Sequence, residues 1–204
     1  VSGIRFDRYV KDSVITPLGL HAGHNNDELD STRRAAIYRY RDGQYVESDA
    51  YGSVAHRLDD YIMGYSAPIF SPTGGVKISA HDLATYMMMH MNYGQLNGVR
   101  IISEESAKTM QTPVWIKLTD DYYEDQYGLC LMEFVDFLDD PHYNTPGNYP
   151  VGHTGDAYGL RSIMIWSPTD GWGIVAITNG YVFNPEKDVV ETLANAIYKA
   201  YFGQ

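Results

Sequence analysis

The segment Gly152-His-Thr-Gly-Asp-Ala-Tyr-Gly-Leu160 brings together residue types that can carry out chemistry. His153 supplies an imidazole, the side-chain group that titrates near neutral pH, and Thr154 adds a hydroxyl beside it. Closely spaced glycines let the backbone of a ligand lie along a strand edge. The amide that follows Gly155 is a candidate oxyanion donor. The alternative is purely structural, because a glycine-bearing edge strand with a polar face has the same composition.

Metal-dependent chemistry is a second possibility that the residue types allow. His21 and His24 are close in sequence, but no cysteine or carboxylate accompanies them at a recognised ligand spacing. A metal-dependent hydrolase built on these two histidines is therefore kept as an alternative. Acidic side chains are frequent over residues 120–140, yet the Asp-x-Asp-x-Asp-Gly pattern of a calcium loop is absent. We expect these acidic side chains to belong to a solvated loop surface.

The composition excludes several classes of protein. A chain of 204 residues forms one domain, or one and a half, with a sizeable core. Its 15 basic and 26 acidic residues leave a net charge of −11, which argues against nucleic acid as a partner. The lone cysteine, Cys130, excludes an internal disulfide framework. Because it lies in an apolar run, we expect a buried, inert thiol.

Residues 1–115 are predicted to form a helical and loop region with a small hairpin. Apolar spacing predicts a helix over 4–15, and Asp42-Gly43 predicts a tight turn between strands at 35–41 and 44–48. Ser79 and Ser103 are the expected N-caps of two further helices. Asp82 is placed to bond the first free amides of the earlier one.

Residues 116–204 are predicted to form an antiparallel sheet with a C-terminal helix packed on it. Strands are expected at 127–135, 151–154, 160–167 and 172–178, with residues 168–171 as the turn of the last hairpin. Asn184 is the expected cap of the final helix, with Pro185 at its first position. The sequence therefore predicts an α+β fold.

Several segments together resemble the serine β-lactamase and penicillin-binding protein superfamily, in its class C-like branch. That family has three catalytic motifs: Ser-x-x-Lys, Tyr-x-Asn or Ser-x-Asn, and Lys/His-Thr/Ser-Gly. The third is similar to His153-Thr154-Gly155. The helix from Val1 with Pro17-Leu-Gly-Leu20 resembles the family segment that follows its tyrosine motif. The run from Thr73 to Ala84 and the run from Arg100 to Met110 also resemble family segments, in the expected order.

Two departures from the family pattern limit what the resemblance implies. No Ser-x-x-Lys and no Tyr-x-Asn occurs in these 204 residues. In the family both precede the segment that Val1 begins, so we expect the nucleophile in a missing N-terminal part of the same protein. His153 also stands where most members have lysine, and a permanent cation is thereby replaced by a pH-dependent donor. This argues against potent β-lactam hydrolysis and leaves ester, amide and D-amino-acid peptide substrates open.

The resemblance implies a serine hydrolase that works through an acyl-enzyme, with no cofactor and no metal. As catalytic residues, His153 and Thr154 would hydrogen-bond the substrate or orient the catalytic hydroxyls. Gly155 would keep the strand edge accessible, and the Asp156 amide would be one oxyanion donor. The Asp156 side chain is expected to point away from the pocket, and Tyr158 to line its rim. The implied substrate is a small peptide, ester or β-lactam, and the implied location is the periplasm or cell surface. The alternative is a non-catalytic binding or regulatory protein.

Overall fold

The computed structural model describes residues 2–118, 123–182 and 188–203. Its α-helices are α1 (Phe6–Val10), α2 (Ala80–Met91), α3 (Glu104–Gln111) and α4 (Val189–Tyr201). One antiparallel sheet holds, in spatial order, β10 (Gly173–Ile177), β9 (Leu160–Trp166), β8 (Val151–Ala157), β7 (Met132–Glu133), β6 (Tyr123–Tyr127) and β5 (Trp115–Leu118). Two small hairpins pair β1 (Tyr38–Arg41) with β2 (Gln44–Glu47) and β3 (Gln95–Leu96) with β4 (Val99–Arg100). The predicted α+β class is confirmed. No helix in the described ranges is long and apolar enough to cross a membrane.

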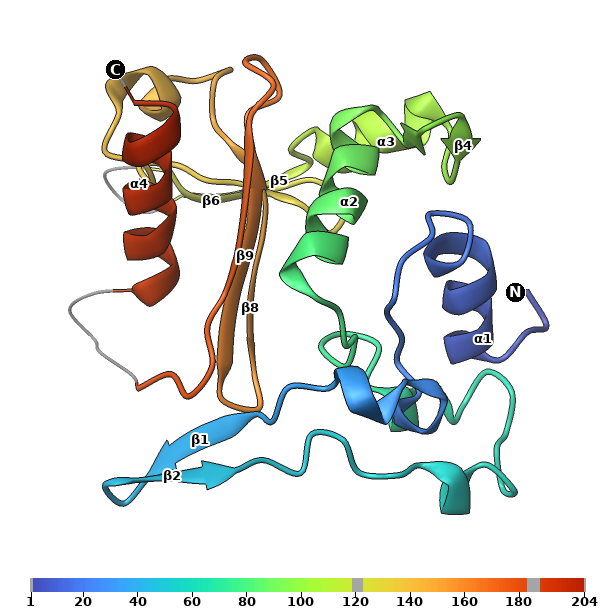
Figure 1. Ribbon diagram of the computed structural model, residues 1–204. Coiled ribbons are helices and arrows are strands. Elements are labelled where there is room, and N and C mark those ends of the chain that lie inside the picture. The colour runs from blue at the N-terminus through green and yellow to red at the C-terminus, as the bar shows by residue number, and fades with distance from the viewer. Residues whose placement is uncertain (1, 119–122, 183–187, 204) are drawn as a thin grey trace.

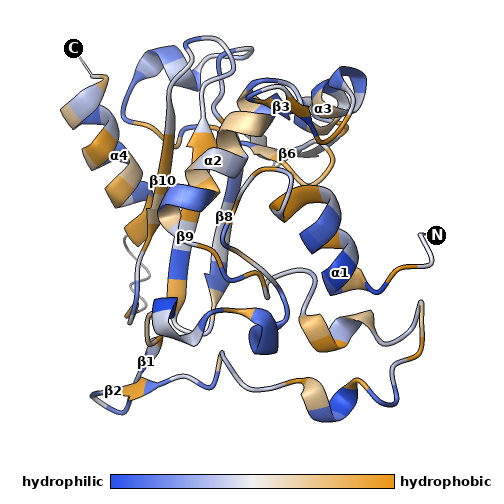
Figure 2. Cartoon of the chain, turned by 45° about the vertical axis from the view of Figure 1, so that its right-hand side comes forward, coloured by the Kyte–Doolittle hydropathy of each residue, from blue (hydrophilic) through white to orange (hydrophobic). Residues whose placement is uncertain are grey.

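Helices cover both faces of the sheet (Figure 1). On one face α4 packs Val190, Ala194 and Tyr198 against Ile163 and Ile165 of β9, and Figure 2 shows the hydrophobic bands along this helix. On the other face α2 contributes the side chains that meet Val151, Met164 and Trp166, namely Leu83, Tyr86, Met87 and Met91. Although α2 belongs to the first predicted region, it packs on strands of the second. These two cores hold β8 and β9 between them.

Local sequence signals act as expected in several places. Asp42 and Gly43 both have positive φ, 49° and 80°, which is the geometry of the tight primed turn. Ser79 Oγ accepts the amide of Asp82 at 3.0 Å and so caps α2. Ser103 caps α3 in the same way. The Asp82 carboxylate differs from expectation: it accepts the backbone amide of His21 at 3.3 Å, and thereby ties a distant loop to the start of α2.

Some boundaries differ from the prediction. The helix expected over 4–15 is α1 followed by a π-helical turn at Lys11–Ile15. The strand expected over 127–135 is interrupted, because the chain turns between β6 and β7 and Gly128 N–H donates to Leu131 O at 2.8 Å. The final helix is capped by Asp188, whose carboxylate accepts the amide of Val190. The expected cap at 184–185 lies outside the described residues.

The prediction of a buried Cys130 was wrong. The residue is exposed, and its φ of 63° places it in the left-handed region at the turn between β6 and β7. Apolar neighbours in sequence suggested burial, but the turn directs this position to the surface while Leu131 enters the core.

Candidate active site

Strand β8 is paired along its whole length on one side only. Every residue from Val151 to Ala157 has a partner on β9. On the other side β7 pairs with Val151 and Gly152 alone. Residues 153–157 therefore have no strand partner on that side in the described part of the chain. An unpaired edge of this kind can accept an extended ligand through main-chain hydrogen bonds.

The turn after β8 determines which main-chain groups face the open edge. Ala157 pairs with Leu160 across a two-residue turn, so hydrogen-bonded pairs recur at every second residue from there. Arg161, opposite Asp156, instead donates its amide to Thr178 Oγ1, and its carbonyl accepts the Thr178 amide. The amide and carbonyl of Asp156 thus point away from β9, toward the open edge, as an oxyanion donor requires. Those of Thr154 point the same way.

His153 and Thr154 lie side by side on this strand with different exposure. His153 is exposed, and its ring meets Tyr127 edge-on with centroids 6.3 Å apart. Its Nδ1 contacts the carbonyl oxygen of Thr154. A carbonyl can only accept, so Nδ1 is the donor in this contact and Nε2 is left to face a ligand. Thr154 is half-buried opposite Ile163 of β9.

Two glycines bring β8 close to β9. A Cβ on Gly152 would lie 1.9 Å from the carbonyl oxygen of Met164, which no side chain can do without moving the backbone. A Cβ on Gly155 would lie 2.4 Å from Ser162 Oγ, so the serine hydroxyl occupies the space that a side chain would fill. Gly152 is therefore needed for the close approach of the two strands, whereas a side chain at Gly155 would require only the Ser162 hydroxyl to move.

The Asp156 side chain is directed along the sheet surface. Its carboxylate is 64% exposed and lies 3.3 Å from Arg161 Nη1, while Arg161 also pairs with Asp188 at the start of α4. The negative charge is thereby compensated by a cation on β9. The backbone amide of the same residue stays free to act at the open edge.

Tyr158 forms the turn after β8 and lies beside two cations. Arg39 Cζ of β1 and Lys77 Nζ each lie 5.6 Å from the centroid of the Tyr158 ring. The fold therefore brings residues from three distant parts of the sequence to the end of the open edge. Neither Arg39 nor Lys77 could be identified from the sequence as a site residue, because each reaches Tyr158 only through contacts between distant segments.

The two histidines weighed as metal ligands have separate environments. His24 is buried, its Nδ1 lies 3.3 Å from Phe70 O, and its ring packs edge-on against Phe6. Burial lowers the pKa of His24. His21 is exposed. In residues 2–118, 123–182 and 188–203, no three histidine, cysteine, aspartate or glutamate side chains are grouped to hold a metal ion.

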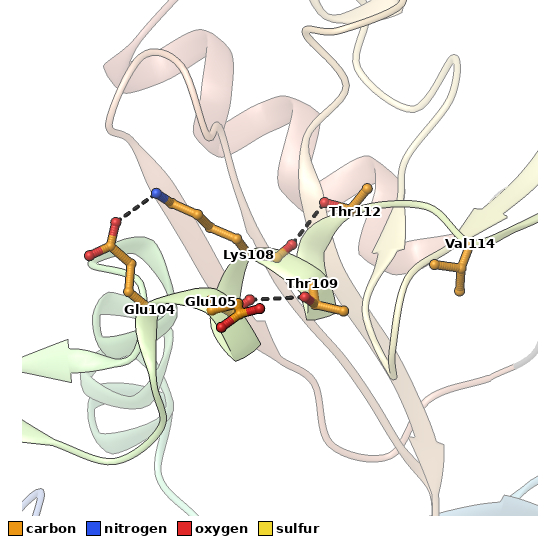
Figure 3. Close-up of a pocket in the computed structure, with 6 residues that line it drawn as sticks. All are labelled: Glu104, Glu105, Lys108, Thr109, Thr112 and Val114. Atoms are coloured by element: carbon orange, nitrogen blue, oxygen red, sulfur yellow. Dashed lines mark hydrogen bonds and ion pairs between the residues drawn. The ribbon is translucent and has the colours of Figure 1, made fainter.

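A surface hollow of about 500 Å³ lies away from β8 along α3 (Figure 3). Its polar groups bond one another at helical spacing: Lys108 with Glu104, and the Thr109 hydroxyl with the Glu105 carbonyl. The Thr112 hydroxyl bonds the Lys108 carbonyl in the same way. These groups satisfy one another within one helix, so we do not assign chemistry to this hollow.

The mixed fold, an antiparallel sheet with helices on both faces, is of the β-lactamase class. The chain belongs to the Beta-lactamase family, whose model matches residues 1–199. No curated protein sequence matches it.

Solved structures agree with this fold. The octameric penicillin-binding protein homologue from Pyrococcus abyssi superposes with a TM-score of 0.69 at 20% identity, over 100% of this chain and 39% of that one. A D-stereospecific amidohydrolase from Streptomyces sp. gives 0.62 at 18% identity, over 100% and 50%. A class C beta-lactamase gives 0.62 at 16% identity, over 99% and 53%. The chain thus spans about half of these proteins or less.

Proposed function

We propose that the chain is the C-terminal part of a serine hydrolase or acyltransferase of the penicillin-binding protein and β-lactamase type. Its substrate would be a D-amino-acid peptide, an ester or a β-lactam. The observation that supports this most strongly is the open edge of β8, which presents His153, Thr154 and the outward amide of Asp156 together. Such an edge can align an extended substrate and hold its carbonyl oxygen at the amide.

The proposed reaction is acyl transfer in two steps. A serine hydroxyl attacks the substrate carbonyl, the ester bond to the enzyme forms, and the leaving group departs with a proton. Water then attacks the ester, releases the acid and restores the hydroxyl. The Asp156 amide would stabilise the oxyanion of both steps, and His153 Nε2 and the Thr154 hydroxyl would bond the substrate.

The serine itself would come from residues outside these 204, because the sequence contains no Ser-x-x-Lys. By itself the 204-residue chain is then inactive in acyl transfer. The names of two structural neighbours, a D-stereospecific amidohydrolase and a class C beta-lactamase, indicate the substrate classes to test first.

A covalent adduct tests the proposal. We expect a protein that includes the upstream sequence to be labelled by a fluorescent penicillin or a fluorophosphonate, with the mass of one adduct. The 204-residue chain alone is the control and should remain unlabelled. An upstream Ser-x-x-Lys without adduct, and without ester or peptide turnover, would contradict the enzyme proposal and support the non-catalytic alternative.

Replacing His153 by alanine is expected to reduce turnover about tenfold, which corresponds to one lost hydrogen bond of about 1.4 kcal/mol. Because His153 is exposed, the melting temperature should stay nearly unchanged. The measurement is kcat/KM together with a thermal melt. His56→Ala, at another exposed histidine, is the matched control and should alter neither quantity. A large loss of stability in His153→Ala would instead assign this residue a structural role.

A further inference from the structure

The turn between β8 and β9 is held in an unusual conformation. Tyr158 has a φ of 59°, in the left-handed region that a bulky residue rarely occupies. Gly159 follows with a φ of 100°, and a Cβ there would lie 2.1 Å from the carbonyl oxygen of Tyr38. Its own carbonyl accepts the Tyr181 amide at 3.1 Å. The turn is thereby clamped against β1, and the Tyr158 ring takes a defined position.

The β1–β2 hairpin is fixed to the same end of the sheet (Figure 1). Asn179 Oδ1 accepts the Tyr38 amide at 2.9 Å, and Asn179 Nδ2 donates to Ala36 O at 2.7 Å. Arg39 follows Tyr38 directly, so its guanidinium is brought to the Tyr158 ring by an anchored backbone. The attraction of a cation to an aromatic face adds to this placement.

Lys77, the second cation at the Tyr158 ring, comes from a different segment of the chain. Its backbone exchanges two hydrogen bonds with Gly23, at 3.1 and 2.8 Å. Its half-buried ammonium donates to Gly75 O at 2.8 Å, which leaves further donors available. Burial lowers the pKa of Lys77, because it removes solvent from the charged ammonium.

These two cations lack an acidic partner. Among the residues that the structure describes, neither Lys77 nor Arg39 forms an ion pair with a carboxylate. Two positive charges therefore lie at one aromatic ring without an acidic partner among the described residues, although carboxylates outnumber cations in this protein of net charge −11. An added anion could therefore form an ion pair that no described residue supplies to these cations.

A hollow of about 210 Å³ adjoins Lys77 and adds to the positive potential. Arg33 and Arg34 also line it. Two carboxylates, Asp30 and Asp82, also line it and accept hydrogen bonds from neutral donors, so the excess is one positive charge. A concave surface with an excess of cations concentrates anions from solution.

We propose that Lys77 and Arg39, arranged around Tyr158, bind a carboxylate of the substrate. The proposal rests on the proposed function, in which the substrate lies along the open edge of β8. Tyr158 follows Asp156 by two residues, in the turn at the end of β8. The preferred substrate would therefore have a carboxylate near its reacting carbonyl, which the Asp156 amide holds. This carboxylate would belong either to the acyl part of the substrate or to its leaving group.

A charged and a neutral ester with the same leaving group test this specificity. The probes are 4-nitrophenyl hydrogen glutarate and 4-nitrophenyl butyrate, hydrolysed by a protein that includes the upstream sequence. We expect Lys77→Met to lower kcat/KM for the glutarate ester about tenfold more than for the butyrate ester. The matched control is Lys199→Met, because Lys199 lies on α4 and forms an exposed ion pair with Asp139. In this control the ratio of kcat/KM for the two esters should not change. An unchanged ratio in Lys77→Met would overturn the proposal while leaving the hydrolase function intact.

Binding to the 204-residue chain gives a readout that does not depend on catalysis. Glutarate and the neutral glutaramide are titrated separately while the signals of the Tyr158 ring are followed by NMR. We expect glutarate to bind at least tenfold more tightly, with the preference lost in Lys77→Met and weakened by salt. Equal affinities would overturn the carboxylate site. A glutarate preference in a protein that hydrolyses neither ester would uphold the site and contradict the hydrolase proposal.

Discussion

Acidification from pH 7 to pH 4 is expected to lower the free energy of unfolding by about 3 kcal/mol through His90 alone. His90 lies on α2, is only 2% exposed, and packs between Tyr86 and Trp166 with ring centroids 4.8 and 6.1 Å away. Its Nδ1 is buried without a hydrogen-bond partner among the described residues. Burial disfavours the imidazolium and lowers the pKa of His90 from 6.5 to about 4.

The direction of the effect follows from proton binding. Between pH 6.5 and 4 the unfolded chain binds a proton at residue 90 that the folded chain does not, so stability falls as pH falls. The stabilisation by neutral His90 is complete above pH 6.5. Urea unfolding at several pH values measures it.

A His90→Phe variant should lose this part of the pH dependence, because phenylalanine fills a similar space and does not titrate. The matched control is His81→Phe on the same helix, where the histidine side chain is 90% exposed. The control should keep the acid sensitivity of the original chain. An equal acid sensitivity in His90→Phe would contradict the assignment.

Gly152→Ala is expected to destabilise the protein by about 3 kcal/mol and to abolish any function of the β8 edge. The added methyl would lie 1.9 Å from the Met164 carbonyl oxygen and 2.9 Å from the Cα of Ile165. These are backbone atoms of β9 that no rotamer change can move away. β8 must therefore shift directly before His153 and Thr154, and the outward amide of Asp156 shifts with them.

Denaturant unfolding and the fluorescent labelling described above measure the two effects. Gly74→Ala is the matched control, since a Cβ there meets nothing within 4 Å and the residue is exposed. It should be neutral or slightly stabilising. If Gly152→Ala were as stable as Gly74→Ala, the close approach of β8 to β9 would not be needed for the fold.

Short-range signals allowed much of the fold to be predicted. The Asp42-Gly43 turn, the caps at Ser79 and Ser103 and the hairpin of β9 and β10 depend on residues close in sequence. Backbone conformation and capping bonds are decided within a few residues, so the sequence specifies them directly. The exposure of Cys130 was missed, because apolar neighbours do not reveal which way a turn directs a side chain.

The candidate site likewise has features that could be predicted from the sequence and features that could not. The histidine, the hydroxyl and the possible oxyanion donor could be recognised from the sequence, since they lie on consecutive residues, but the strand was predicted over 151–154 only, whereas β8 continues to Ala157. That β7 covers only its first two residues could not be predicted, because strand pairing depends on where distant segments end. The meeting of Arg39, Lys77 and Tyr158 is hidden in the sequence for the same reason.

The sequence by itself determined the α+β class, the family resemblance and the residue types available at the strand. Tertiary structure alone decided which edge of β8 is open, which amides face it, and which cations lie at its end. The physical reason is that a side chain's type is local, whereas its partners and solvation depend on segments tens of residues away that packing brings together.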